Sequence, residues 1–126
     1  MRMIKFKAQR VDSLEWIYGY YVKDPSGFHR IYLQPFSDAT SNTYYFVIED
    51  TIVQFTGLLD KYKKEIYEGD IIEHEGNHVC IIVFDSGAFK MKYIRGSETG
   101  ITRYIGYSAQ FCRVIGNVFE NQDLLK

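Results

Sequence analysis

Apolar and polar residues alternate along most of this chain, and a period of two is typical of β-strands. The opening stretch MIKFKAQ places Ile4, Phe6 and Ala8 on one face of a strand, with lysines on the other. The stretch LEWIYGYYV repeats the alternation over residues 14–22. A surface helix needs apolar residues three or four apart, so this pattern argues against helices as the main elements of the fold.

Turn residues divide the alternating stretches into short strands. The turn DPSG, residues 24–27, lies between residues 14–22 and FHRIYL, so residues 14–33 are predicted to form a hairpin. SDATSN, residues 37–42, is predicted to be a polar loop. The further predicted strands are YYFVI, TIVQF, IIEHE, HVCIIVF, AFKMKYI, ITRYIGY and CRVIGNVF. Short strands at regular spacing predict an all-β fold, as a meander, sandwich or small barrel, with a helical turn only in the final ENQDLLK.

Composition narrows the classes of function. Aromatic residues make up 17% of the chain, which suits half-buried sheet surfaces. The formal net charge of −1 provides no overall basic field for nonspecific nucleic-acid binding. No apolar run approaches the roughly 18 residues of a membrane span, and the charged opening stretch is not a signal peptide, so we expect a cytoplasmic protein. Cys80 and Cys112 form no CxxC pair and are predicted to be buried free thiols in a reducing compartment.

The length suits one ordinary domain, and residues 1–126 are predicted to form a single unit. The charged stretch TGLLDKYKKEIYEGD, residues 56–70, is the least strand-like part of the middle of the chain. A subdivision there separates an N-terminal β-unit, residues 1–55, from a C-terminal small barrel, residues 65–120. Within YEGD, Asp70 is predicted to accept backbone N–H bonds in a turn before the next strand.

The stretch HEGNH, residues 74–78, matches the H-E-x-x-H pattern of zinc metalloproteases, in which two histidines hold the metal. That site needs a helix, because a helix places residues four apart on one face. Gly-Asn at residues 76–77 disfavours a helix and suits a two-residue hairpin turn between β-branched flanks. With that turn His74 pairs with Val79, so His74 and His78 are predicted to point to opposite faces.

Two weaker metal hypotheses remain open in the same region. Glu73, Glu75 and His78 are candidate metal ligands at the hairpin tip. The carboxylates and histidines of residues 65–78 are the candidate centre of a metal-dependent hydrolase. Glu98 lies 20 residues after His78, near the position where one class of zinc proteases keeps its third ligand. A solvated tip and ordinary turns explain these residues better, so no catalytic residue, metal or cofactor is assigned.

A basic turn is the candidate binding surface. Lys61, Tyr62, Lys63, Lys64 and Tyr67 combine positive charge with aromatic rings, which is typical of nucleic-acid-binding surfaces. A solvated turn explains the same residues, so nucleic-acid binding is an alternative function here and not the preferred one.

Segments at the start, middle and end of the chain carry a family resemblance. QFTGLLDKYKKEIYEGDII, residues 54–72, VIGNVFENQDLL, residues 114–125, and the opening MIKFKAQ are similar to segments of the YopX family. That family consists of small proteins carried largely by bacteriophages and prophages. Gln9 stands where the family has an aromatic residue, Leu59 where a lysine is common, and residues 62–63 where Asn-Gly is usual, so a wider turn is predicted there.

The resemblance implies a mostly β fold, with an SH3-like small barrel beginning near YEGDII, and it implies self-association. It implies no assigned activity. Together with the absence of a recognisable catalytic set, it predicts a non-catalytic phage or prophage accessory protein in the cytoplasm of a bacterial host. We expect this protein to form a homo-oligomer and to bind another protein. A nucleic-acid-binding β-barrel is the first alternative, and a metal-dependent hydrolase is the second.

Overall fold

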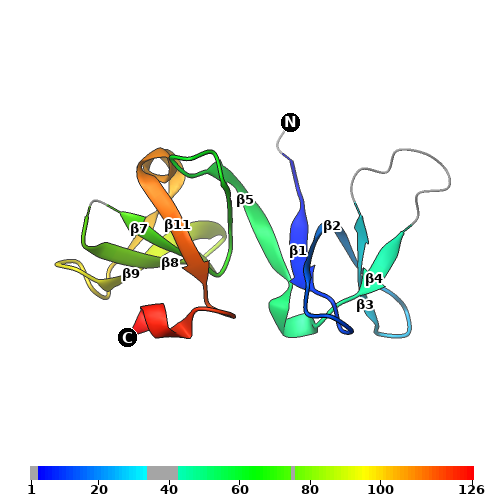
Figure 1. Ribbon diagram of the computed structural model, residues 1–126. Helices are drawn as coiled ribbons and strands as arrows, with labels where there is room; N and C mark the ends of the chain where they lie inside the picture. The colour runs from blue at the N-terminus through cyan, green and yellow to red at the C-terminus, as the bar shows by residue number, and fades with distance from the viewer. Residues whose placement is uncertain (1–2, 34–42, 75) are drawn as a thin grey trace. The chain divides into compact units, whose positions relative to one another are not determined.

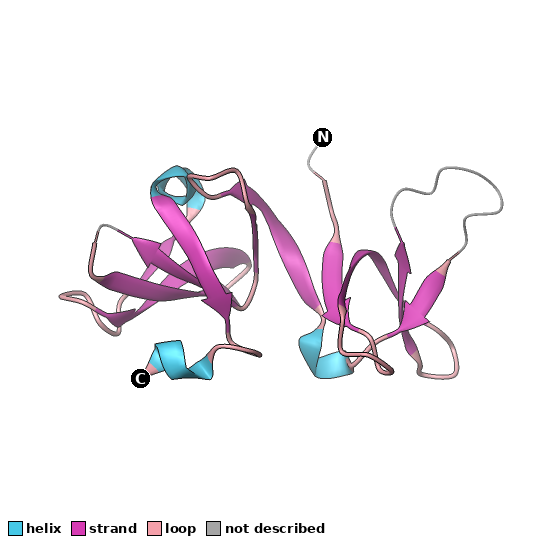
Figure 2. Cartoon of the chain, in the orientation of Figure 1, coloured by secondary structure: helices cyan, strands magenta, loops and turns pink. Residues whose placement is uncertain are grey.

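The computed structural model describes residues 3–33, 43–74 and 76–126, and antiparallel strands dominate these residues (Figures 1 and 2). The predicted all-β class is confirmed. Helical structure in the described residues is limited to short 3-10 turns, one of which, η3 (Gln122–Leu125), is the predicted turn in ENQDLLK. None of the described helices is long and apolar enough to cross a membrane. The polar loop predicted at 37–42 lies outside the described residues.

The chain divides into two compact units, Met1–Phe55 and Thr56–Lys126. The N-terminal unit is an antiparallel meander, with strands ordered β4-β3-β2-β1-β5. Its elements are β1 (Phe6–Gln9), β2 (Trp16–Lys23), β3 (His29–Leu33), β4 (Tyr44–Phe46), the 3-10 turn η1 (Glu49–Thr51) and the first part of β5 (Val53–Leu59).

The predicted hairpin at residues 14–33 is present as β2 and β3. At its turn, the Gly27 N–H donates to the Asp24 carbonyl over 2.9 Å, and the Phe28 N–H donates to the Asp24 side chain over 3.0 Å. Gly27 has a φ of 93°, a conformation that is strained for residues with a Cβ. The turn predicted from DPSG is therefore confirmed.

The meander curls until its two ends meet. Although β4 and β1 are separated by two strands in the sheet order, Val47 forms an antiparallel bridge with Arg10. The Val11 N–H donates to the Phe46 carbonyl over 3.0 Å at the same place. The sheet therefore closes partly on itself, next to β4.

The inner face of this curled sheet holds the core of the N-terminal unit. Ala8, Ile31 and Val47 are its buried centre, and the partly buried residues packed against them are Phe6, Ile17, Tyr21 and Ile52. Gly19 lies on the same face, and a Cβ there would lie 1.9 Å from the Tyr32 carbonyl oxygen. The backbones thus approach at Gly19 more closely than any side chain allows.

The C-terminal unit contains a five-stranded antiparallel sheet ordered β10-β9-β8-β7-β11. Its elements are β6 (Glu65–Tyr67), which is next to β5, then β7 (Asp70–His74), β8 (His78–Asp85), β9 (Ala88–Arg95), β10 (Thr102–Tyr104), the 3-10 turn η2 (Gly106–Phe111) and β11 (Cys112–Asn117). The register of β11 against β7 shifts between Val114 and Gly116, which marks a β-bulge. The SH3-like character of this unit stays a prediction.

The core of the C-terminal unit is aliphatic, with both cysteines inside it. Its fully or nearly fully buried members are Ile66, Ile72, Cys80, Ile82, Met91, Tyr93, Ile105, Ala109 and Cys112. Neither of these cysteines forms a disulfide, and both are buried, as predicted. Burial raises the pKa of the Cys80 thiol to about 12, and the neighbouring Cys112 adds to that shift.

A single carboxylate organises the turn before β6. Asp60 is only 3% exposed, and its Oδ1 accepts the N–H groups of Tyr62 and Lys64 over 2.8 and 2.9 Å. Its Oδ2 accepts the N–H of Val114, in β11, over 3.0 Å. Burial alone would raise the pKa of this carboxyl, but the three backbone hydrogen bonds and the charge of Lys64 outweigh it, and the net pKa is lowered. Asp60 therefore joins two of the segments that carry the family resemblance.

Candidate functional site

β7 ends at His74 and β8 begins at His78, with Gly76 and Asn77 in a turn, so the predicted hairpin is confirmed and none of these described residues is helical. The predicted register is wrong by one residue. His74 pairs directly with His78, Glu73 with Val79 and Ile72 with Cys80. Cross-strand partners share a face, so the two histidines lie on the same face and not on opposite ones. The hydrophobic pattern does not discriminate between the registers, because both faces of these strands carry buried apolar residues.

Both histidine rings pack against one tyrosine. The ring centroids of His74 and His78 lie 6.4 and 5.5 Å from that of Tyr93, each edge-on. The His78 ring also covers Gly96, where a Cβ would lie 2.1 Å from the ring carbon Cδ2, and its Nε2 lies 3.1 Å from the Ser97 hydroxyl. The Nδ1 atoms of both histidines are buried, without a hydrogen-bond partner in the described part of the chain. The pair is thus packed around Tyr93.

Glu98 lies near this pair but is bound elsewhere. Its carboxylate accepts two hydrogen bonds from the Arg103 guanidinium, over 2.7 and 3.4 Å. These bonds hold the pKa of Glu98 below its usual value, with smaller contributions from His78 and His74. Within residues 3–33, 43–74 and 76–126, no group of three or more His, Cys, Asp or Glu is placed to hold a metal ion.

The candidate ligands at the hairpin tip are not brought together. Glu73 lies on the face opposite His78 and accepts a hydrogen bond from Arg113 over 3.1 Å. Glu75 lies outside the described residues. Asp70 is buried and accepts the Tyr67 N–H over 2.8 Å, which is the turn role predicted for it.

The basic turn presents four of its five candidate residues to solvent. Lys61, Tyr62, Lys63 and Lys64 are exposed, and the Lys61 ammonium lies 5.3 Å from the centre of the Tyr62 ring. Tyr67 is 2% exposed and belongs to the interior, so including it in a binding surface was wrong. Ile66 and Tyr67 point to opposite faces of β6 and are both buried, so both faces of this strand are covered.

A larger exposed surface lies on the outer face of β2, β3 and β4. We call it the aromatic face; it consists of the exposed residues Tyr18, Tyr20, Val22, Phe28, Tyr44 and Phe46 and the half-buried Arg30 and Tyr32. The strand pairing aligns Tyr20 with Tyr32 and Tyr32 with Tyr44, so the rings form rows across the sheet. Ring centroids are 5.2 Å apart for Tyr32–Tyr44 and 5.6 Å apart for Phe28–Phe46. Sequence analysis placed Tyr18, Tyr20 and Val22 on one face without showing that this face is exposed.

One cation lies among these rings. The Arg30 guanidinium is 4.5 Å from the centre of the Tyr44 ring and 5.3 Å from that of Phe46. It is also paired with the Asp24 carboxylate over 2.9 Å. The charge of Arg30 is therefore balanced within the face, which leaves an aromatic surface that carries little net charge.

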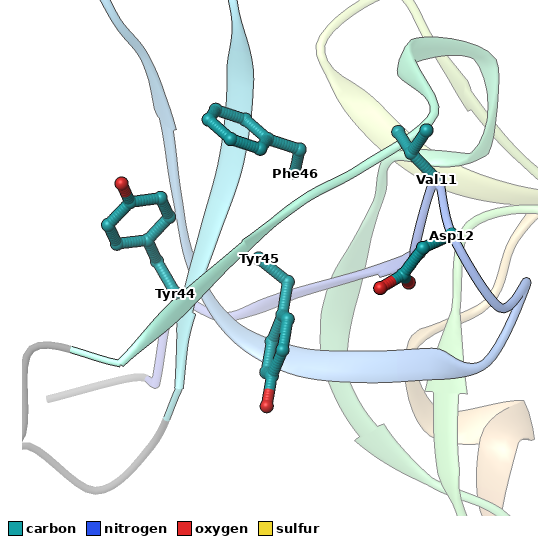
Figure 3. Close-up of a pocket in the computed structure, with 5 residues that line it drawn as sticks. All are labelled: Val11, Asp12, Tyr44, Tyr45 and Phe46. Atoms are coloured by element: carbon teal, nitrogen blue, oxygen red, sulfur yellow. The ribbon is translucent and has the colours of Figure 1, made fainter.

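A pocket lies beside the border of the aromatic face (Figure 3). We call it the β4 pocket; its volume is about 360 Å³, and it is lined by Val11, Asp12, Tyr44, Tyr45 and Phe46. Tyr45 projects from the opposite side of β4 to Tyr44 and Phe46. Val11 and Asp12 come from the segment that meets the end of β4, where the curled sheet closes.

These features define a class: a small all-β protein of two compact units, whose described residues present an aromatic surface and a small pocket. The YopX protein family model matches residues 5–126, and the chain belongs to this family. No curated protein matches the chain. The crystal structure of protein EF1440 from Enterococcus faecalis is similar to this chain, with a TM-score of 0.58, 21% sequence identity and full coverage of both chains. At that identity the likeness concerns the fold alone.

Proposed function

We propose that this chain is a non-catalytic β-module that self-associates and binds a protein partner through its aromatic face. The observation that carries this proposal is the row of rings across β2, β3 and β4, which are exposed on β2 and β4 and half-buried on β3. Tyrosine offers a large rigid contact area and a polar hydroxyl, and it is enriched among the residues that dominate protein interfaces. Soluble monomers rarely expose a contiguous surface of this kind without a partner.

Charge supports a protein partner over a nucleic acid for this face. Residues 1–55 contain six basic and six acidic residues, so the N-terminal unit carries no net charge when His is neutral. Arg30 is paired with Asp24, and the Lys7 ammonium lies 4.7 Å from the centre of the Trp16 ring. A phosphate backbone needs a positive field, which a balanced surface does not supply.

The setting we propose is that of an accessory protein of a phage or prophage, in the cytoplasm of a bacterial host. Membership of the YopX family supports this setting. The proposal involves no cofactor and no catalytic residue.

Replacing Tyr20 with lysine tests the self-association. Tyr20 is 39% exposed on β2, where it is paired with Tyr32 within the aromatic face, so a charge there opposes burial against a second copy. We expect the dissociation constant for self-association, measured by sedimentation velocity, to rise at least about tenfold, because loss of a central interface residue costs more than about 1.4 kcal/mol.

The matched control is Tyr104→Lys, on exposed β10 in the other unit, which should leave self-association unchanged. A parent chain that stays monomeric at the highest soluble concentration contradicts self-association. A photo-crosslinking residue at position 20 then tests for a different protein partner. If it crosslinks to other proteins no more strongly than the same residue at position 104, the proposal is contradicted.

Nucleic-acid binding by the basic turn is a second candidate, favoured by the four exposed side chains Lys61, Tyr62, Lys63 and Lys64. Its expected result is retention on single-stranded DNA that weakens as salt rises. Changing the three lysines to glutamine should lower the slope of log K against log salt by about two, the effect of three lost phosphate contacts. A charge-matched control changes the exposed Lys23, Lys92 and Lys126. Equal slopes for the two triple variants exclude the turn.

A further inference from the structure

β4 lies at the end of the sheet order, with β3 as its one neighbour among the described strands. Its other side is open among the described residues, except where Arg10 and Val11 meet Val47 and Phe46. The Val47 N–H donates to the His29 carbonyl of β3, whereas the Phe46 carbonyl points the other way and accepts the Val11 N–H. Backbone groups alternate in direction along a strand, so the N–H and C=O of Tyr44 point to the open side with those of Phe46. An edge of this kind can pair with an added strand.

The β4 pocket lies along this edge, and most of its wall is apolar. Val11, Phe46 and the tyrosine rings supply that wall, and Asp12 supplies the carboxylate. Its volume of about 360 Å³ is at the small end of the range of ligand sites, which is roughly 300–1,000 Å³. This space suits one or two side chains better than a cofactor.

The carboxylate in the pocket is already neutralised. Both oxygens of Asp12 accept hydrogen bonds from the Arg10 guanidinium, over 2.9 and 2.7 Å. The same guanidinium lies 3.9 Å from the centre of the Tyr45 ring. A cationic ligand would have to compete with Arg10 for Asp12, and an anionic one would lose its solvation while Arg10 is already paired. An uncharged apolar group therefore fits the pocket best.

We propose that an extended segment of a partner protein pairs with the open edge of β4 and inserts one uncharged apolar side chain into the β4 pocket. Tyr44 and Phe46 belong both to the pocket and to the aromatic face, so the bound segment runs along the border of the proposed interface. This inference rests on the proposed function, because it specifies the chemistry of the protein that is bound.

The test is a titration of the ¹⁵N-labelled full chain with capped pentapeptides of sequence Thr-Val-X-Val-Thr, followed by two-dimensional NMR. With leucine at X we expect saturable shifts of the amides of Val11, Asp12, Tyr44, Tyr45 and Phe46 at millimolar peptide, the affinity range of a single inserted side chain. With aspartate at X the affinity should fall at least about tenfold, since the carboxylate loses its solvation.

Val11→Lys places a charge in the pocket at a position that is 59% exposed, so the fold should tolerate it while leucine-peptide binding is lost. Phe84→Lys, at a residue 54% exposed in β8, is the matched control and should bind like the parent. Absence of saturable shifts in the parent, or equal binding by the Val11→Lys variant, overturns the inference. If the peptides do not bind but crosslinking at position 20 succeeds, only the proposed role of the β4 pocket is rejected. If the peptides bind but the chain shows neither self-association nor crosslinking, only the proposed function is rejected.

Discussion

Replacing Asp60 with alanine is expected to destabilise the C-terminal unit by about 3 kcal/mol, because three partly buried backbone N–H groups each lose a charged acceptor. These N–H groups belong to Tyr62, Lys64 and Val114, and the Asp60 side chain that accepts their hydrogen bonds is only 3% exposed. Amide hydrogen exchange measures the effect unit by unit, and the loss of protection should be strongest in β7, β8 and β11.

The matched control is Asp85→Ala, which removes a carboxylate from the exposed end of β8, where its partner is Lys90. An exposed ion pair contributes little, so this variant should unfold nearly like the parent. Equal effects of the two substitutions contradict the role assigned to Asp60.

The pH dependence of Asp60 provides a separate readout. The pKa of this carboxyl is lowered in the folded chain, so the unfolded chain binds the proton more readily. Its stabilising contribution is complete above the ordinary aspartate pKa of about 4 and is lost as the pH falls through the folded-state pKa. Asp60→Asn keeps the shape but cannot titrate, so this variant should be less stable at neutral pH and should lose less stability on acidification than the parent.

Gly19→Ala is expected to destabilise the N-terminal unit by about 3 kcal/mol or more, at or beyond the upper end of the usual cost of overpacking. The added Cβ would lie 1.9 Å from the Tyr32 carbonyl oxygen, so the backbone of β3 must move away from β2. Rotation of a flexible side chain cannot relieve this overlap. The midpoint temperature of thermal unfolding should fall by about 10 °C or more, because a loss of 1 kcal/mol lowers it by about 4 °C in a domain of this size.

Gly27→Ala separates crowding from backbone strain. Gly27 has a positive φ of 93°, but nothing lies within 4 Å of its Cβ position, so alanine should cost about 1–2 kcal/mol through strain alone. If Gly19→Ala proves no more damaging than Gly27→Ala, then β2 and β3 do not approach as closely as described.

The sequence predicted the class of fold because alternation and turn chemistry are local. The β2–β3 hairpin, the Asp70 turn and the Gly116 bulge all depend on residues close together in the chain. The β7–β8 register cannot be predicted in this way, because both faces of these strands are apolar. The contacts that distinguish the two faces come from residues distant in sequence, such as Tyr93. A shift of one residue then reversed the predicted orientation of the histidines.

The candidate site was less predictable than the fold. Alternation over residues 14–22 separates Tyr18, Tyr20 and Val22 from Ile17 and Tyr21. It does not show that Ile17 and Tyr21 are the residues that pack inward. Only the curl of the sheet, fixed by the bridge between Arg10 and Val47, decides which face is inside. Asp60 was read as part of a solvated turn because its partner Val114 lies 54 residues away.

The two buried thiols make this chain convenient to label. Cys80 has a pKa of about 12 and Cys112 is fully buried, so neither offers a reactive thiolate to maleimide at neutral pH. A cysteine introduced on the aromatic face could carry a dye or spin label without removal of the native pair. Distances between such labels on neighbouring copies would then test the proposed self-association directly.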